Sequence, residues 1–365
     1  PTRRSSDLVE IPKDNGKLRL LGIPTVVDRL VQQAINQVLT PIYENQFSKT
    51  SYGFRPRRGC HDALRGAQRI INEGYIYVVD LDLERFFDTV SHSKLIEILS
   101  RTIKDGRVVS LIHKYLRSGV MNKGLFEASE EGTPQGGPLS PLLSNIMLNE
   151  LDKELERRGL PFVRYADDSM IFCKSRRAAM RVKESITRFI ENTLYLKVNK
   201  EKTVVSYVRG VKYLGYSFYV MKGKCQLTVH PKSKAKMKSR LKELTSRSNG
   251  WGYAKRKQKL KEYIRGWVGY YHLANMKRLL LETDEWLRRR IRMCIWKAWK
   301  KVKTKVANLI KCGISKYKAY EWGNTRKGYW RIADSYILHR AITKEHLCRA
   351  GYATLMDAYL EWYPK

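Results

Sequence analysis

The sequence is poor in acidic residues, and this shortage is the first constraint on function. Its 365 residues contain 35 Asp and Glu against 71 Lys and Arg, so the formal net charge is +36. A surplus of this size repels itself unless a polyanion neutralises it. The composition therefore favours a nucleic-acid partner over the alternative of an ordinary solvated basic surface.

Long apolar runs and paired cysteines are also missing. No window approaches the roughly 18 uncharged apolar residues of a membrane span, and the first twenty residues have no apolar core typical of a signal peptide. The six cysteines are scattered without a Cys-x-x-Cys pair, which argues against a disulfide framework and a structural zinc site. We therefore expect a folded protein of a reducing compartment, with no membrane partner.

The first eight residues differ in character from the rest of the chain. Residues 1–8, PTRRSSDL, begin without Met and join abruptly to an ordered pattern. The octapeptide can be encoded by a common sequencing-library adapter, so we predict that 1–8 is a non-native leader on an N-terminally truncated chain. An ordinary flexible N-terminus is the alternative.

The remaining chain predicts an α+β fold followed by an all-α region. Residues 9–23 read as a hairpin around Asp-Asn-Gly, and Thr25 is a candidate N-cap for the helix after it. Apolar residues at 75–87 indicate a buried strand, and the Gly/Pro-rich loop at 132–140 leads into a long helix. A composition shift near 228–234 marks a domain boundary, beyond which the pattern is helical and basic.

Two adjacent aspartates interrupt the apolar segment RYADDSMIF at 164–172. The flanks predict two strands of a buried sheet, with Asp167 and Asp168 at the tip of the hairpin. A solvated turn, where Asp is common, is the alternative. Two carboxylates at the end of a buried hairpin suit a divalent cation such as Mg²⁺.

A third carboxylate is available in VVDLDLERFFD. Asp80 and Asp82 lie on one face of a strand, because side chains alternate with a period of two. Carboxylates from two neighbouring strands can hold two Mg²⁺ ions about 3.5–4 Å apart for in-line phosphoryl transfer. Phe87 lies close behind, where an aromatic ring can exclude a 2′-hydroxyl.

These motifs, in this order, resemble the reverse transcriptases encoded by bacterial group II introns. The resemblance rests on YADD, on the upstream Asp82 and Phe87, on GTPQGGPLSPLLSNIMLNELD, on SYGFRPRRGCHDAL and on VKYLGYSF. LKEYIRGWVGYYHLANM at 260–276 is similar to the thumb, or maturase, signature of that family. The resemblance implies a right-hand polymerase with an antiparallel palm sheet and a helical thumb.

The resemblance also implies roles for individual residues. The catalytic, metal-binding aspartates correspond to Asp82, Asp167 and Asp168, with Asp80 as the substitute for Asp82. The dNTP-binding residues correspond to Lys13, Arg19, Phe87 and Gln135. Template and primer contacts correspond to Arg55, Tyr213, Gly215 and Tyr216, although the two tyrosines fit packing equally well.

We expect fingers and palm over 9–228, a helical thumb over 229–310 and a small basic nucleic-acid-binding tail over 311–365. Residues 230–305 carry 24 Lys and Arg against five acidic residues, and Arg288, Arg289 and Arg290 are expected to face the polyanion. In the tail, aromatic and basic residues interleave. Its cysteines and histidines lack the clustering that the family's optional endonuclease needs.

The predicted function is RNA-directed DNA polymerisation for a group II intron in a prokaryotic cytoplasm. The implied partners are an RNA template, a DNA or RNA primer, dNTPs, two Mg²⁺ ions and the intron RNA that a maturase binds. Three alternatives stay open: an RNA-dependent RNA polymerase, another prokaryotic reverse transcriptase of a diversity-generating or defence system, and an RNA-binding splicing helper without polymerase activity.

Overall fold

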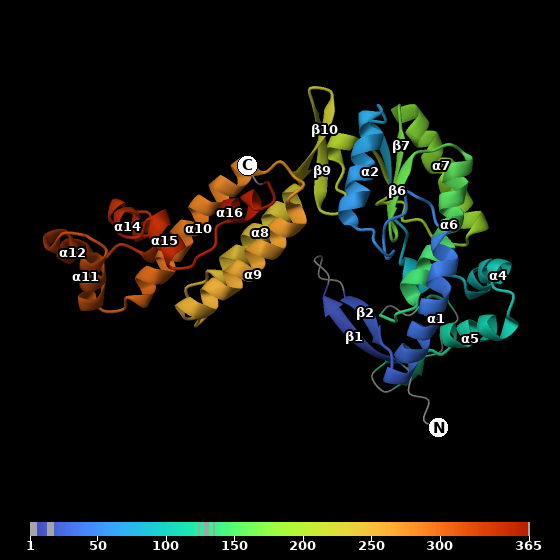
Figure 1. The fold of residues 1–365 in the computed structure, drawn as a ribbon, viewed down its shortest axis with the longest axis horizontal. Helices are drawn as coiled ribbons and strands as arrows, with labels where there is room; N and C mark the ends of the chain where they lie inside the picture. The colour runs from blue at the N-terminus through green and yellow to red at the C-terminus, as the bar shows by residue number, and fades with distance from the viewer. Residues whose placement is uncertain (1–5, 13–17, 123–124, 128–130, 134–135, 364–365) are drawn as a thin grey trace. The chain divides into compact units, whose positions relative to one another are not determined.

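The computed structural model describes residues 6–12, 18–122, 125–127, 131–133 and 136–363. They divide into two compact units (Figure 1). The first falls within 1–214 and 218–225, and the second within 215–217 and 226–365. The second unit thus begins slightly before the boundary predicted at 228.

The first unit is built on a four-stranded antiparallel sheet with the order β6-β7-β3-β8. Its strands are β3 (Tyr77–Leu81), β6 (Phe162–Tyr165), β7 (Asp168–Cys173) and β8 (Val204–Tyr207). Figure 1 shows α2 (Cys60–Asn72) on one side of these strands, and α6 (Ser140–Arg157) and α7 (Arg176–Thr193) on the other. The strand–turn–strand predicted around Asp167 is confirmed.

Alternation along the strands separates the core from the acidic face. Val79 and Leu81 of β3 belong to a large buried cluster that also contains Ile171 of β7 and much of α6. Asp80 and Asp82 have the opposite parity, so they lie on the other face of the sheet. Apolar β3 residues therefore anchor the strand while its carboxylates stay outside that cluster.

A second four-stranded sheet has the order β2-β1-β4-β5. In the sequence, β1 and β2 come before β3, and β4 and β5 come between β3 and β6. It comprises β1 (Ser6–Pro12), β2 (Leu18–Ile23), β4 (Val120–Asn122) and β5 (Leu125–Glu127). The predicted hairpin is confirmed, since β1 pairs antiparallel with β2. β1 begins inside the segment predicted to be a non-native leader, but backbone pairing is independent of side chains and leaves that prediction untested.

Helices complete the first unit. Thr25 caps α1 (Val26–Glu44) as predicted, because its side chain accepts a hydrogen bond from the backbone N–H of Asp28 at 3.2 Å. A short helix, α3 (Phe86–Thr89), comes after the acidic strand. α4 (His92–Thr102) and α5 (Gly106–Leu116) pack together beyond it.

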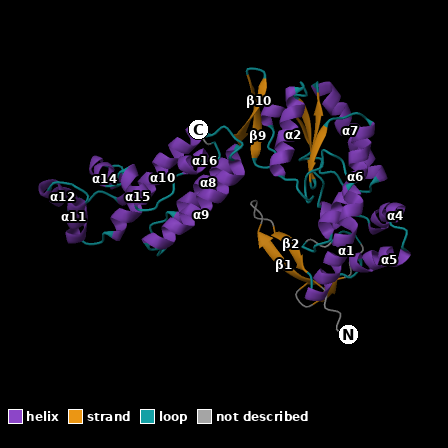
Figure 2. Cartoon of the chain, viewed as in Figure 1, coloured by secondary structure: helices purple, strands orange, loops and turns teal. Residues whose placement is uncertain are grey.

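The chain beyond β9 (Tyr216–Met221) and β10 (Lys224–Val229) is helical (Figure 2). Three long helices come first: α8 (Pro231–Leu244), α9 (Tyr253–Tyr271) and α10 (Lys277–Ala298). Six shorter ones come after them: α11 (Val302–Lys311), α12 (Lys316–Gly323), α13 (Tyr329–Ile332), α14 (Tyr336–Ala341), α15 (Lys344–Arg349) and α16 (Leu355–Leu360). No helix among the described residues is both long and apolar enough to span a bilayer.

The predicted tail packs onto the thumb helices within one unit. Asp284 of α10 accepts hydrogen bonds from the backbone N–H groups of Leu355 and Met356, both at 2.9 Å, which satisfies the first turn of α16. Tyr359 donates to the carbonyl of Ala274 at 3.1 Å. Residues 311–365 are therefore integrated with 229–310, where the sequence predicts a separate segment.

Two of the arginines expected to face a polyanion make internal contacts instead. Arg289 lies over the Trp330 ring at 3.9 Å and pairs with Asp334 at 3.0 Å. Arg290 donates to the side chain of Thr245 at 2.6 Å. Arg289 thus anchors the tail, and Arg290 anchors the connection between α8 and α9. The sequence pattern predicts which face of a helix a residue lies on, but it does not predict what packs against that face.

Candidate active site

The pairing of β3 with β7 brings the predicted carboxylates together. Asp80 lies opposite Met170 and Leu81 opposite Ser169, and Asp82 and Asp168 are the residues next to this last pair. Directly opposed residues of an antiparallel pair share a face. Asp80, Asp82 and Asp168 therefore lie on one face, with Asp167 in the turn that precedes β7.

The charges of these carboxylates act on one another. Loss of hydration in its partly buried position raises the pKa of Asp80 to about 6, and the negative charges of Asp168 and Asp82 add to the rise. Loss of hydration also raises the pKa of Asp168 to about 6, and the negative charges of Asp167 and Asp82 raise it further. In both cases the loss of hydration is the larger cause and the neighbouring carboxylates are the smaller one, while Lys212 and Lys202 partly offset the rise at Asp168.

Residues 197–203 hold the backbone around Asp82. The Asp82 carbonyl accepts from the backbone N–H of Asn199 at 2.9 Å, and the Asp82 N–H donates to the Thr203 hydroxyl at 3.2 Å. Lys202 Nζ lies 3.1 Å from Asp82 Oδ2 as an ion pair, although this buried oxygen forms no well-directed hydrogen bond. The buried Asp82 oxygen thus has the Lys202 ammonium as its partner within the chain.

The donor set fits a divalent cation, although the side chains do not already enclose one. Among the described residues, no three Asp, Glu, His or Cys side chains are grouped tightly enough to hold a metal ion as they stand. Mg²⁺ takes hard oxygen ligands and keeps several waters or substrate phosphates, so few protein ligands are needed. The carboxylates of Asp82, Asp167 and Asp168 supply oxygen donors of that kind.

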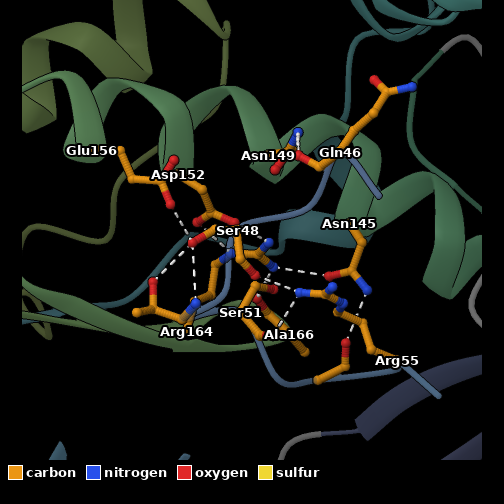
Figure 3. A network of polar contacts seen from close by, with 12 residues as sticks. Gln46, Ser48, Ser51, Arg55, Asn145, Asn149, Asp152, Glu156, Arg164 and Ala166 are labelled. Carbon is orange, nitrogen blue, oxygen red and sulfur yellow. Dashed lines mark hydrogen bonds and ion pairs between the residues drawn. The ribbon is translucent and has the colours of Figure 1, made fainter. Parts of the chain in front are cut away.

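The acidic turn is supported from behind by a buried polar network (Figure 3). Arg164 of β6 forms a fully buried, bidentate ion pair with Asp152 of α6 and also donates to Ala166 O at 3.0 Å. Asn145 of α6 accepts from Arg164 at 2.9 Å and donates to Gly53 O at 2.9 Å. This network joins α6, the hairpin and the loop before α2.

Arg55 is part of that support rather than of an open surface. Its side chain is buried and pairs with Glu44 at 2.7 Å. The guanidinium also donates to the carbonyl of Ser48 and, at 2.9 Å, to the carbonyl of Ser51. The contact with template that the resemblance implies is therefore not available to this side chain, which holds the 48–55 loop instead.

Of the four residues predicted to bind dNTP, the structure describes Phe87 and Arg19. Phe87 is half-buried in α3, packs on the core and meets Phe86 edge-on at 5.4 Å between ring centroids. The Phe87 carbonyl accepts from Thr133 N–H at 2.6 Å, which fixes the start of the Gly/Pro-rich loop. Arg19 lies opposite Ile11 in the β1–β2 hairpin. Lys13 and Gln135 fall outside the described residues.

The residues expected to grip the primer are packing residues. Tyr213 and Tyr216 are buried, and the Tyr216 hydroxyl donates to the carbonyl of Tyr270. Gly215 has φ +82°, and a Cβ there would lie 2.5 Å from the Tyr271 hydroxyl. Neither tyrosine ring is exposed to a primer, so the motif shapes the start of the second unit.

The buried network around Arg164 was not predicted from the sequence. One signal was available: Arg164 is a charged residue in a strand that is otherwise apolar or aromatic, FVRY. A second was the pair Asn145 and Asp152, which lie seven residues apart and hence on one face of the helix. Their convergence required the tertiary structure.

Comparisons with known proteins agree with this geometry. Residues 11–218 match the family described as "Reverse transcriptase (RNA-dependent DNA polymerase)", and residues 234–313 match "Group II intron, maturase-specific domain". A solved structure of apo telomerase from Candida tropicalis has a TM-score of 0.50 at 13% identity, covering 97% of this chain and 70% of that one. At that identity the likeness concerns the fold alone.

Two bacterial proteins are similar in sequence. Protein YkfC of Escherichia coli K12 is 37% identical over 255 residues, covering 59% of this chain and 66% of YkfC. The group II intron-encoded protein LtrA of Lactococcus lactis is 32% identical over 273 residues, covering 57% of this chain and 45% of LtrA. The matched part is thus less than two thirds of either relative. The chain belongs to the reverse transcriptase family and carries the maturase-specific domain of group II intron proteins.

Proposed function

We propose that this protein is an RNA-directed DNA polymerase that extends a primer on an RNA template with dNTPs. The observation that supports the proposal is the β3–β7 register, which ends with Leu81 opposite Ser169, one residue from both Asp82 and Asp168. The family match over 11–218 supports the same reaction. We assign the activity to the prokaryotic cytoplasm, since YkfC and LtrA are bacterial proteins.

Asp82, Asp167 and Asp168 would hold two Mg²⁺ ions, which supply Lewis-acid activation of a primer 3′-hydroxyl and charge stabilisation for the leaving pyrophosphate. The chain itself orients the carboxylates. Thr203 and Asn199 fix the backbone of Asp82, and the Arg164 network supports the turn that carries the other two.

Selection of the deoxy sugar falls to Phe87 in this proposal. Its backbone is held by Thr133, and its ring packs on Phe86, so the ring cannot move aside easily to admit a 2′-hydroxyl. Lys13, Arg19 and Gln135 are the proposed contacts of the incoming triphosphate and base. A guanidinium binds phosphate bidentately, and a lysine does so as a point charge.

Primer extension tests the proposal. An RNA template with an annealed DNA primer, dNTPs and Mg²⁺ is given to the wild type, to Asp168→Asn and to Glu184→Gln. Glu184 is an exposed α7 residue outside the site, so its variant controls for loss of one surface charge. We expect extension by the wild type and Glu184→Gln only.

Each alternative gives a different result in the same assay. Preference for NTPs over dNTPs would identify an RNA-dependent RNA polymerase. No extension by the wild type, together with assisted splicing of an intron RNA, would identify a splicing helper. Extension without selective binding of group II intron RNA would favour a reverse transcriptase of another system.

We also propose that the second unit binds intron RNA as a maturase, because residues 234–313 match the maturase-specific domain. Binding through phosphates predicts a steep salt dependence. Neutralising exposed cations should weaken binding of the intron RNA and flatten the salt slope. The exposed cations of α8 and α9 to be neutralised are Lys232, Lys238, Lys255, Lys261 and Arg265.

The last part of the chain is the proposed surface for unpaired bases. Tyr317, Tyr320 and Tyr336 are exposed by 81%, 52% and 58%, which is unusual for rings of this size. Lys318 Nζ lies 5.7 Å from the centre of the Tyr336 ring. Exposed rings beside cations stack with bases and attract phosphates with little regard to sequence.

A further inference from the structure

A single guanidinium links the acidic turn to the helix behind it. Arg164 stands three residues before Asp167, and its side chain is fully buried. It donates to both carboxylate oxygens of Asp152, at 2.8 and 2.5 Å, to the side-chain oxygen of Asn145 at 2.9 Å, and to the carbonyl of Ala166 at 3.0 Å (Figure 3). The last of these bonds reaches the turn itself.

Ala166 has an unusual backbone conformation in that turn. Its φ is +57°, a left-handed conformation that residues with a Cβ avoid unless their surroundings impose it. The bond from Arg164 to the Ala166 carbonyl fixes the peptide that joins Ala166 to Asp167. The direction in which Asp167 and Asp168 leave the turn therefore depends on that bond.

The same turn is also in contact with the loop before α2. A Cβ on Gly53 would lie 2.2 Å from the backbone nitrogen of Ala166, so these two backbones are in direct contact. The backbone of Arg164 bonds to Thr50 O at 3.0 Å and accepts from Tyr52 N–H at 2.9 Å. The turn thus contacts a packed loop and also accepts a hydrogen bond from the arginine of a buried ion pair.

Asn145 connects the two supports. Its side-chain oxygen accepts from Arg164, and its side-chain N–H donates to Gly53 O, each at 2.9 Å. One buried amide therefore sets the guanidinium and the loop at a fixed spacing. Its removal leaves both partners in place but uncouples them.

Stability alone does not require this arrangement. Apolar side chains of similar size usually replace a fully buried ion pair with no loss of stability, because the charges give up their hydration on burial. An apolar replacement cannot donate to the Ala166 carbonyl, however. The specific contribution of the charged pair is thus the bond at the turn.

We propose that Arg164, held by Asp152 and Asn145, is a positioning residue that fixes the Ala166 turn and so aims Asp167 and Asp168. The inference rests on the polymerase function proposed above. It assigns to these residues an effect on turnover that is separate from their effect on folding.

Two variants test it. Asn145→Ala uncouples the supports, and its control is Asn149→Ala, one turn further along α6. Asn149 is also buried, but its amide donates only to Gln46 O at 3.2 Å, away from the hairpin. The second variant, Arg164→Met with Asp152→Leu, removes the ion pair without leaving an unpaired buried charge.

We expect Asn145→Ala and the double variant to keep a cooperative unfolding transition and an unchanged KM for dNTP. Their kcat in primer extension should fall about 100-fold, as for a reacting group displaced by about an ångström. Asn149→Ala should retain the wild-type kcat. Amide hydrogen exchange at 165–168 should accelerate in Asn145→Ala but not in Asn149→Ala.

The outcomes separate this inference from the proposed function. If the wild type extends primers, Asp168→Asn does not, and Asn145→Ala matches Asn149→Ala in kcat and in exchange at 165–168, the positioning role is wrong while the function stands. If the wild type extends no primer, the function is wrong. The exchange comparison then still decides whether Arg164 and Asn145 fix the turn.

Discussion

Replacing Asp80 by Asn should make the metal-free protein more stable at neutral pH. Asp80 lies on the same face of the sheet as Asp82 and Asp168. Loss of hydration and the negative charges of these two residues raise the pKa of Asp80 from 3.8 to about 6. The ionised carboxylate is therefore less favourable in the folded chain than in the unfolded one. Asn keeps the shape and polarity of the side chain without the charge.

The rise in pKa sets the size and the sign of the effect. At about 1.4 kcal/mol per pH unit, a rise from 3.8 to about 6 corresponds to about 3 kcal/mol. The folded state binds more protons at Asp80 between these values, so the contribution of this group to wild-type stability falls as pH increases from about 4 to about 6 and is constant above that. Asp80→Asn should gain up to about 3 kcal/mol at pH 8 and nothing below pH 4.

Urea unfolding in EDTA, without nucleic acid, measures this difference at pH 4, 5, 6 and 8. Glu184→Gln on α7 serves as the control for loss of a surface charge. Addition of Mg²⁺ at pH 8 should narrow the gap between the wild type and Asp80→Asn, because a cation offsets the same repulsion. An Asp80→Asn variant equal to or less stable than the wild type at pH 8 would refute the reasoning.

Other contacts lead to three further predictions. Gly53→Ala should cost about 1–3 kcal/mol and most of the extension activity, since its Cβ would lie 2.2 Å from Ala166 N, while Gly210→Ala, in open space, should cost neither. Phe87→Ala should raise NTP incorporation relative to dNTP incorporation about tenfold or more in single-nucleotide extension. Tyr317→Ala should weaken binding of single-stranded oligonucleotides by about 1–3 kcal/mol without changing Tm, because the ring is 81% exposed.

Local pattern was enough to predict the elements that carry the site. Short apolar runs predicted β3 and the β6–β7 hairpin, and Thr25 predicted the start of α1 through its hydroxyl cap. The motif around Asp82 and the YADD segment predicted which carboxylates belong together. These features depend on residues close in sequence, where the strand period and capping preferences act.

Contacts between distant residues were not predictable in the same way. Arg55 and Arg290 have the sequence context of exposed cations, yet one pairs with Glu44 and the other donates to Thr245. Tyr213 and Tyr216 lie in a motif associated with primer, yet both are buried. A charge or ring can serve a surface or a core equally well until its neighbours are known.

By itself the sequence determined the surplus of positive charge and the strand and helix pattern, and it predicted which carboxylates share a cation. Only the tertiary structure decided how those carboxylates are presented. The turn at Ala166 is set by Arg164, Asn145 and Gly53, which come from a strand, a helix and a loop far apart in the chain. The sequence alone does not show that these three residues meet, because the hydrogen-bond partners of a buried guanidinium are whichever groups the fold packs around it.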